Sequence, residues 1–230
     1  MLDTSRIQAI TIDLDDTLWP IAPTMHRAER VLRDWLRPQA PATVALMETP
    51  GRARALREQV LRTQPGIAHD LTAVRRAYIR LALVEAGDDP ALAEGGYDLF
   101  FAERQKVDLY DDALPALEAL SARWPVVALS NGNASLQSIG IHRFFHAGIG
   151  AREFGVAKPD ARIFHAAAGL AGVAPQAVLH VGDDAALDVA GALAAGMQAA
   201  WVNRAGAPWP GGAAPQATVG GLAELLELLP

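Results

Sequence analysis

Cysteine is absent from this 230-residue chain, which excludes disulfide bonds, thiolate metal sites and cysteine nucleophiles. Long apolar runs are also missing, because none approaches the roughly 18–20 residues that cross a membrane. The segment from Met1 to Arg6 lacks the basic and then apolar layout of a signal peptide. We therefore expect a cytoplasmic protein without a membrane partner.

The chain has no excess of positive charge, and its net charge of −6 disfavours a nucleic-acid partner bound through a general basic surface. Low-complexity segments and internal repeats are absent, and 51% of the residues are hydrophobic, which indicates a folded chain. Acidic residues are unevenly spread. Between Pro20 and Lys106 there are 13 basic and 11 acidic residues, whereas the rest of the chain has 7 and 15. This difference favours two units.

The segment from Pro20 to Lys106 has helical periodicity and no convincing strand. Thr24 is a plausible cap for a first helix that ends near Leu36. Five later prolines divide the remainder into about four or five helices: Pro38, Pro41, Pro50, Pro65 and Pro90. We expect an all-helical unit over residues 20–106.

On either side of that unit, apolar strand-like runs alternate with helical segments. The runs cover residues 10–12, 126–129, 146–150, 177–181, 198–202 and 217–219. This alternation predicts an α/β fold, a parallel sheet with helices on both faces. Ligands bind such sheets at the carboxyl ends of the strands, where this chain has Asp13, Ser130 and Asp183.

Three carboxylates, Asp13, Asp15 and Asp16, follow the first run. If the strand continued, Asp13 and Asp15 would share one face and Asp16 would point away. Two neighbouring carboxylates require a cation or a shared proton. The sequence therefore predicts a charged site at this strand end.

The residues of this edge suit phosphoryl transfer. Asp13 can attack phosphorus, and Asp15 can protonate the leaving oxygen and then activate water. Asp13 and Asp183 offer the oxygen ligands that Mg²⁺ prefers. Hydrogen bonds from Ser130 and the Asn131 amide, with the charge of Lys158, could hold the phosphoryl group.

Four segments resemble the four motifs of the haloacid dehalogenase superfamily, in the order of that family. They are Asp-Leu-Asp-Asp-Thr after the first strand, Leu-Ser-Asn-Gly after the second, Val-Ala-Lys-Pro-Asp before a helix, and Val-Gly-Asp-Asp-Ala-Ala-Leu-Asp-Val-Ala-Gly-Ala after a later strand. The resemblance implies a Rossmann-like core, residues 1–19 and 107–230, with a helical cap inserted over residues 20–106.

Carried over by position, the resemblance also implies a role for each motif residue. Asp13 would be the nucleophile and a metal ligand, Asp15 the acid/base with its carbonyl on the metal, and Asp183 a metal ligand. The phosphate-binding residues would be Ser130, Asn131, Lys158 and Thr17, with Asp184 and Asp188 as supporting acids. Asp188 is the stronger candidate for orienting Lys158 or the metal-bound water.

The sequence thus predicts a Mg²⁺-dependent phosphomonoesterase that acts on a small phosphorylated metabolite through an aspartyl-phosphate. The Asp-Leu-Asp-Asp-Thr-Leu-Trp form of the first motif resembles members acting on flavin mononucleotide (FMN) or nucleoside monophosphates. A phosphosugar mutase on the same scaffold is the alternative. A 2-haloacid dehalogenase is disfavoured because that branch lacks the second Asp, and a non-catalytic binding module is disfavoured by the intact acid set. Oligomeric state cannot be read from the sequence.

Other residues leave their roles open. Trp19 is either an aromatic group that faces substrate or a packing residue. His180 lies within a strand, so a structural role is the default. The arginines of the helical segment favour solvated surface, although one of them could reach an anionic substrate.

Overall fold

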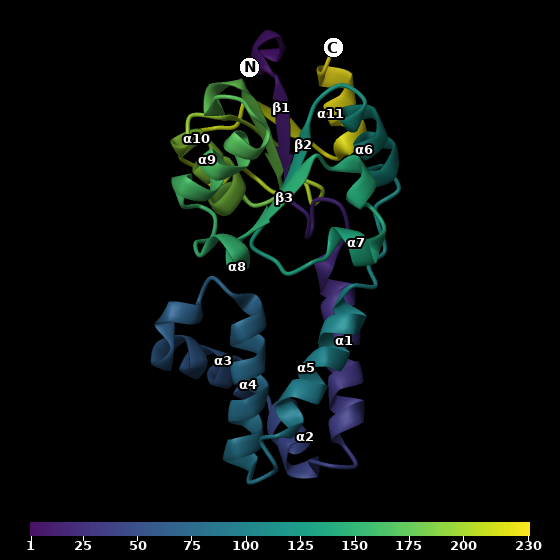
Figure 1. Ribbon diagram of the computed structural model, residues 1–230, viewed down its shortest axis with the longest axis vertical. Coiled ribbons are helices and arrows are strands. Elements are labelled where there is room, and N and C mark those ends of the chain that lie inside the picture. Colours follow the sequence, from purple (N-terminus) through teal and green to yellow (C-terminus); the bar gives the residue numbers. More distant parts are fainter. The chain divides into compact units, whose positions relative to one another are not determined.

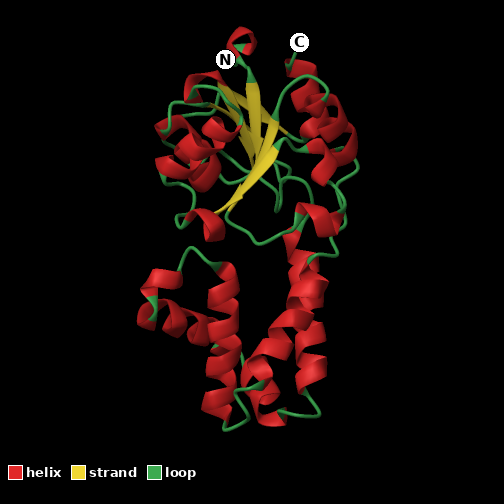
Figure 2. Ribbon diagram, in the orientation of Figure 1, coloured by secondary structure: helices red, strands yellow, loops and turns green.

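The computed structural model describes all 230 residues, which divide into two compact units (Figure 1). The first unit comprises Met1–Pro20 and Asp108–Pro230, and the second comprises Ile21–Val107. Every strand belongs to the first unit, while the regular elements of the second are all helical (Figure 2). The second unit is therefore an insertion that begins directly after Pro20.

Six parallel strands form one sheet in the order β3-β2-β1-β4-β5-β6. They are β1 (Ala9–Ile12), β2 (Val126–Ser130), β3 (Ala147–Gly150), β4 (Val178–Gly182), β5 (Gln198–Val202) and β6 (Ala217–Val219). Strands β1, β2, β4 and β5 are buried along their whole length, as expected for parallel strands covered on both faces. The predicted α/β fold with a Rossmann-like parallel sheet is confirmed.

Helices cover both faces of the sheet, with α9 (Ala161–Leu170) and α10 (Gly191–Ala194) on one side and α6 (Ala113–Ser121) and α11 (Leu222–Leu228) on the other (Figure 1). Beneath α9 and α10, apolar side chains such as Val127, Phe164 and Ala199 form a buried cluster. The remaining short elements of this unit are η1 (Thr4–Arg6), α7 (Leu136–Ile139), η3 (His142–Phe144), α8 (Ala151–Phe154), η4 (Pro175–Ala177) and η5 (Ala185–Ala190).

Strand β1 occupies the position where the strand order reverses, since β2 lies on one side of it and β4 on the other. Ile12, its last residue, is opposite Ala128 of β2 and Val181 of β4. The carboxyl ends of β1, β2 and β4 therefore lie side by side, and the residues that follow them emerge at the same edge of the sheet. This is the edge at which open parallel sheets bind ligands.

The second unit has its own apolar core, which includes Leu32, Tyr78 and Phe100. Its helices are α1 (Ile21–Leu36), α2 (Pro41–Glu48), α3 (Arg52–Thr63), α4 (Leu71–Ala86) and α5 (Leu92–Arg104), with the short turn η2 (Pro65–Ile67). Helix α1 begins at Ile21, earlier than the expected start at Thr24. Pro23 is accommodated because it lies in the first turn, where the main-chain N–H has no helical partner. None of the helices of the protein is both long and apolar enough to span a membrane.

Arginines of the second unit pair mainly with acids of the same unit. The ion pairs are Arg52 with Glu85, Arg54 with Glu58, Arg75 with Glu29, and both Arg76 and Arg80 with Glu94. Each of these arginines would have to exchange its acid in order to bind an anionic substrate, whereas Arg57 lies over the ring of Tyr78. The contacts therefore support the solvated-surface interpretation for most of the set.

Asp112, at the start of α6, joins three segments of the first unit. Its carboxylate accepts hydrogen bonds from Arg204 (2.9 and 3.1 Å) and from the main-chain N–H of Leu222 (2.7 Å). The same guanidinium group donates to the carbonyl of Thr17 (3.0 Å). Burial raises the pKa of Asp112, but these donors outweigh it and lower the pKa below its ordinary value.

We predict that Asp112→Asn lowers the free energy of unfolding by about 1–2 kcal/mol near neutral pH, because charge-assisted hydrogen bonds are weakened. A carboxyl group with a lowered pKa stabilises the fold above its unfolded pKa of about 3.9, and this stabilisation is lost as pH falls through the folded pKa. Urea titrations should therefore show a difference between wild type and variant that shrinks below about pH 4.

Asp111→Asn is the matched control, because Asp111 is the exposed neighbour and the chemical change is identical. It should leave the free energy of unfolding unchanged. A cost that is equal for both variants, or that does not diminish in acid, would contradict this account of Asp112.

Candidate active site

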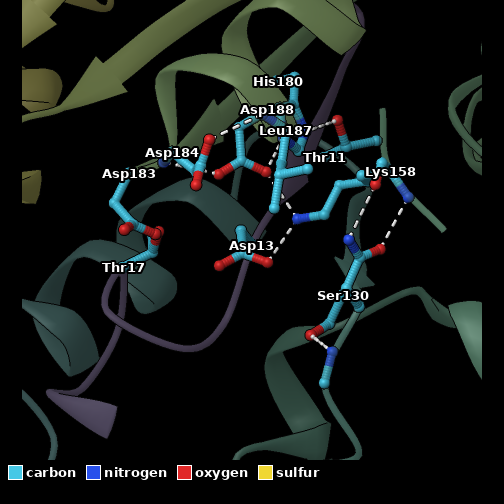
Figure 3. Close-up of polar contacts among 12 residues, drawn as sticks. Thr11, Asp13, Thr17, Ser130, Lys158, His180, Asp183, Asp184, Leu187 and Asp188 are labelled. Atoms are coloured by element: carbon cyan, nitrogen blue, oxygen red, sulfur yellow. Dashed lines mark hydrogen bonds and ion pairs between the residues drawn. The ribbon is translucent and has the colours of Figure 1, made fainter. Parts of the chain in front are cut away.

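The side chain of Asp13, directly after β1, lies between Lys158 and Asp183 (Figure 3). Lys158 Nζ is 2.5 Å from Asp13 Oδ1 and 2.6 Å from Asp188 Oδ1, and all three of these side chains are buried. Burial lowers the pKa of Lys158, but the two carboxylates raise it above its ordinary value of 10.5. Lys158 is thus a buried, permanently charged ammonium group. Burial raises the pKa of Asp13 well above its usual range, although Lys158 opposes this shift.

The side chain of Asn131, in the loop after β2, makes two hydrogen bonds to the main chain of Lys158. The Asn131 Oδ1 accepts from the Lys158 N–H (2.7 Å), and Nδ2 donates to the Lys158 carbonyl (3.0 Å). The Asn131 side chain is therefore committed to positioning the lysine. Its neighbour Ser130 accepts a hydrogen bond from the Gly132 N–H (2.9 Å) through Oγ. Phosphate binding by Ser130 and by the Asn131 amide stays a prediction.

Asp188 receives three hydrogen bonds and is almost fully buried. Lys158 and His180 Nε2 (3.1 Å) contact Oδ1, and the Asp184 N–H donates to Oδ2 (2.9 Å). Burial raises the pKa of Asp188, but Lys158 and His180 outweigh it and bring the pKa well below the usual range. The backbone at Gly182 passes so close that an added Cβ would lie 2.3 Å from the Asp188 carboxyl carbon. Glycine is therefore required before Asp183 for packing reasons.

His180 and Thr11 belong to this network although the sequence did not single them out as site residues. Burial lowers the pKa of His180, so its imidazole is neutral. Since an ionised Asp188 can only accept, Nε2 carries the proton, and Nδ1 accepts from Thr11 Oγ1 (2.9 Å). The two residues meet because Thr11 and His180 are partners in the register of β1 and β4. A single sequence does not reveal that register.

Asp183 is the second carboxylate beside Asp13. Its Oδ1 accepts from Thr17 Oγ1 (3.1 Å), and its main-chain carbonyl accepts from the indole N–H of Trp201 (2.6 Å). Burial and the charge of Asp188 raise the pKa of Asp183 to about 7. The predicted contact of Thr17 with phosphate is untested, and its observed partner is Asp183.

Asp15 lies in a turn rather than on a strand. Strand β1 ends at Ile12, and Asp16 adopts a left-handed conformation (φ 60°), so strand alternation does not extend to Asp15 or Asp16. That Asp16 points away from the site stays a prediction, although its charge contributes to the raised pKa of Asp183. The Asp15 carboxylate instead accepts a hydrogen bond from the Trp19 indole N–H at 2.8 Å.

Asp184, expected to be a supporting acid, caps the helical turn η5. Its exposed carboxylate accepts from the N–H groups of Ala186 and Leu187, both at 2.8 Å. Its own N–H is the group that donates to Asp188. Asp184 thus supports the site through its main chain.

The acid cluster suits a divalent cation. Ligand atoms of Asp13, Asp183 and Asp188 lie within 4.8 Å of one another. These three carboxylates face one ammonium group, Lys158. Burial is the main cause of the raised pKa values of Asp13 and Asp183, and the charge of Asp188 adds to both shifts. Both oxygens of Asp188 already accept hydrogen bonds, whereas Lys158 engages only Oδ1 of Asp13, so Asp13 and Asp183 are the stronger candidates for metal ligands. All-oxygen ligands favour a hard cation.

A family model of haloacid dehalogenase-like hydrolases matches residues 7–196. The chain belongs to this family. The family predicted from the four motifs is therefore confirmed, and with it a hydrolase rather than a binding module.

Individual members of the haloacid dehalogenase-like hydrolases resemble this chain over most of its length. It is 34% identical to 5-amino-6-(5-phospho-D-ribitylamino)uracil phosphatase YigB of Escherichia coli, over 86% of this chain and 84% of that protein. It is 30% identical to glyceraldehyde 3-phosphate phosphatase of Methanopyrus kandleri, with the same two coverages. A solved structure described as 2-haloacid dehalogenase from Pseudomonas syringae pv. Tomato superposes with a TM-score of 0.89 at 36% identity, covering 96% of this chain and 97% of that one.

We predict that Asp183→Asn raises the melting temperature of the metal-free hydrolase by roughly 3 °C or more at pH 8, because a carboxylate that is costly to ionise becomes neutral. The raised pKa of Asp183 destabilises the fold to its full extent above about pH 7, and this cost fades as pH falls from there toward the unfolded pKa of about 3.9. Thermal melts in chelator should therefore show a gain that shrinks below pH 7.

Asp184→Asn serves as the control, since asparagine caps a helix as well as aspartate does. Its melting temperature should match that of wild type. A lower melting temperature for Asp183→Asn would mean that the carboxylate stabilises this edge rather than straining it.

Proposed function

We propose that this hydrolase is a divalent-cation-dependent phosphomonoesterase that acts on a small phosphorylated metabolite through an aspartyl-phosphate. One observation carries the proposal: the buried Asp13 carboxylate lies 2.5 Å from a charged lysine and beside a second carboxylate, Asp183. This arrangement offers a nucleophile, a positive charge for the phosphoryl oxygens and a cation site. Two of the relatives above carry phosphatase names, which supports the same reaction class.

In the proposed reaction, an oxygen of Asp13 attacks phosphorus and the bond from phosphorus to the leaving oxygen breaks. Asp15 donates a proton to that leaving oxygen and then accepts a proton from the water that attacks the aspartyl-phosphate. Lys158 and Ser130, with the main-chain amide N–H of Asn131, would hold the phosphoryl oxygens. Thr17 would join them by exchanging its hydrogen bond to Asp183. The products are an alcohol and inorganic phosphate.

The residues of the site fit Mg²⁺, which Asp13, Asp183 and the main-chain carbonyl of Asp15 would hold. When bound, the ion supplies the positive charge that keeps Asp13 ionised and offsets the charge of the phosphate. Lys158 alone cannot do this, since Asp188 shares it. The raised pKa values of Asp13 and Asp183 are the observation that supports this assignment.

For the substrate, we propose a metabolite with a phosphorylated ribityl or ribose group, such as FMN or a nucleoside monophosphate. The support is the name of the relative YigB, a phosphatase whose substrate carries its phosphate on a ribityl chain. Residues 21–107 form a compact helical unit of suitable size for a cap that selects substrates.

A 2-haloacid dehalogenase is the second candidate, because the solved structure at 36% identity carries that description. The two reactions differ at Asp15, since displacement of a halide needs no proton for the leaving group whereas a phosphate ester of an alcohol does. Incubation with 2-haloacids should release no halide. Halide release at a rate above phosphate release would favour the dehalogenase.

We predict that the purified protein releases inorganic phosphate from members of a panel of phosphorylated metabolites when Mg²⁺ is present. Chelation should stop the reaction, and added Mg²⁺ should restore it. Asp13→Asn should lower kcat by at least about 10³-fold, because the nucleophile is lost, while the melting temperature shows that the fold is kept.

Asp184→Asn is a suitable activity control, because it changes a neighbouring acid whose carboxylate only caps a helix. It should retain nearly full activity. Phosphate release by Asp13→Asn at the wild-type rate would show that the nucleophile is misassigned.

A further inference from the structure

Trp19 belongs to the first unit, two residues before the helical insertion begins at Ile21, and its side chain has no exposed surface. A buried indole has one polar atom, the N–H group, which can donate a hydrogen bond but cannot accept one. This N–H donates to Asp15 Oδ1 at 2.8 Å. The bulk of Trp19 is therefore packed, and its one polar atom meets the proposed acid/base.

The main chain also holds Trp19 beside Asp15. The carbonyl of Trp19 accepts the Asp16 N–H (2.8 Å), and residues 15 and 19 are paired by an isolated parallel bridge. Within the same turn, the Leu18 N–H donates to the Leu14 carbonyl (2.8 Å). The left-handed conformation of Asp16 reverses the chain so that these bonds can close. The indole position is thus set by the turn that also carries Asp15.

This geometry matters for a carboxyl group that gives and takes a proton. Outside a strand or helix, an aspartate side chain can rotate about its bonds, and each lost orientation slows proton transfer. A hydrogen bond from a rigid, buried donor restricts that rotation. Because an indole cannot accept a proton, it does not compete with the leaving oxygen or the water for the proton of Asp15.

We propose that Trp19 is a positioning residue whose indole N–H holds the Asp15 carboxyl group in the orientation that transfers the proton. This inference rests on the proposed function, because it requires Asp15 to be the acid/base. Trp19 is then neither an aromatic group that faces substrate nor a residue that only packs.

Leaving-group dependence distinguishes positioning from packing. An alkyl phosphate needs a proton on its leaving oxygen, whereas p-nitrophenyl phosphate has a good leaving group and needs much less help. The ratio kcat/KM reports the step that phosphorylates Asp13 and is insensitive to the later attack by water. Loss of the indole N–H should therefore lower kcat/KM selectively for the alkyl phosphate.

The test uses the full-length protein with Trp19 replaced by benzothienylalanine, which keeps the bicyclic shape but has sulfur in place of the N–H, and in parallel Trp19→Phe. The alkyl substrate is the metabolite that gives the highest phosphate release in the panel. We expect its kcat/KM to fall on the order of ten-fold, with a clearly smaller change for p-nitrophenyl phosphate. Melting temperatures measured alongside report any loss of packing.

Trp124→Phe is the matched control, because the Trp124 indole also donates to an oxygen, the Ile7 carbonyl at 3.2 Å, away from the proposed site. This variant should have the wild-type kcat/KM for both substrates. Equal loss for both substrates in the benzothienylalanine protein, or no loss, would overturn the positioning role and leave Trp19 as a packing residue.

Asp15→Asn separates this inference from the proposed function. If Asp15 is the acid, that variant shows the same selectivity between leaving groups, with a larger loss of about 10²–10⁴-fold. Selective loss in Asp15→Asn without any in the Trp19 proteins would refute the inference alone. Failure of Asp15→Asn to discriminate, or a wild type that releases no phosphate, would overturn the proposed function and the inference together.

Discussion

The site depends on one buried positive charge, the ammonium group of Lys158. An ammonium group removed from water is costly unless carboxylates lie against it, and Asp13 and Asp188 do so at 2.5 and 2.6 Å. Each neighbour of this group has a role in holding the arrangement. Asn131 clamps the lysine main chain, His180 and the Asp184 N–H fix Asp188, and the bare backbone of Gly182 gives Asp188 its space.

The positive charge of Lys158 does not fully offset the cost of ionising the neighbouring carboxyl groups. Asp13 and Asp183 both have raised pKa values because burial and neighbouring acids oppose their ionisation. Such an edge is less stable than a neutral one, which is the expected cost of a site built to receive a cation and an anionic substrate. Indole and guanidinium groups hold the chain around it. Trp19 contacts Asp15, Trp201 contacts the Asp183 carbonyl, and Arg204 contacts the Thr17 carbonyl.

Sequence reasoning succeeded where simple geometry applies. Asp13 and Asp183 directly follow parallel strands, and Ser130 is the last residue of another, so their position at one edge of the sheet could be predicted without coordinates. It failed where local backbone or register decides the outcome. Strand β1 stops at Ile12 and the chain turns through the left-handed Asp16, so Asp15 meets Trp19 rather than sharing a strand face with Asp13. The pairing of Thr11 with His180 depends on a register that no local pattern encodes.

The central claim, that Asp13 becomes covalently phosphorylated, can be tested by acid-quenching the enzyme during turnover with Mg²⁺ and substrate and mapping modified peptides by mass spectrometry. The account predicts one phosphoryl group on the peptide that contains Asp13, assigned by fragmentation to that residue, and none in the Asp13→Asn protein. A phosphoryl group on a different residue would contradict it. So would turnover in which rapid quenching at every time point finds no phosphorylated enzyme and isotope-labelled water attacks the substrate directly with inversion at phosphorus.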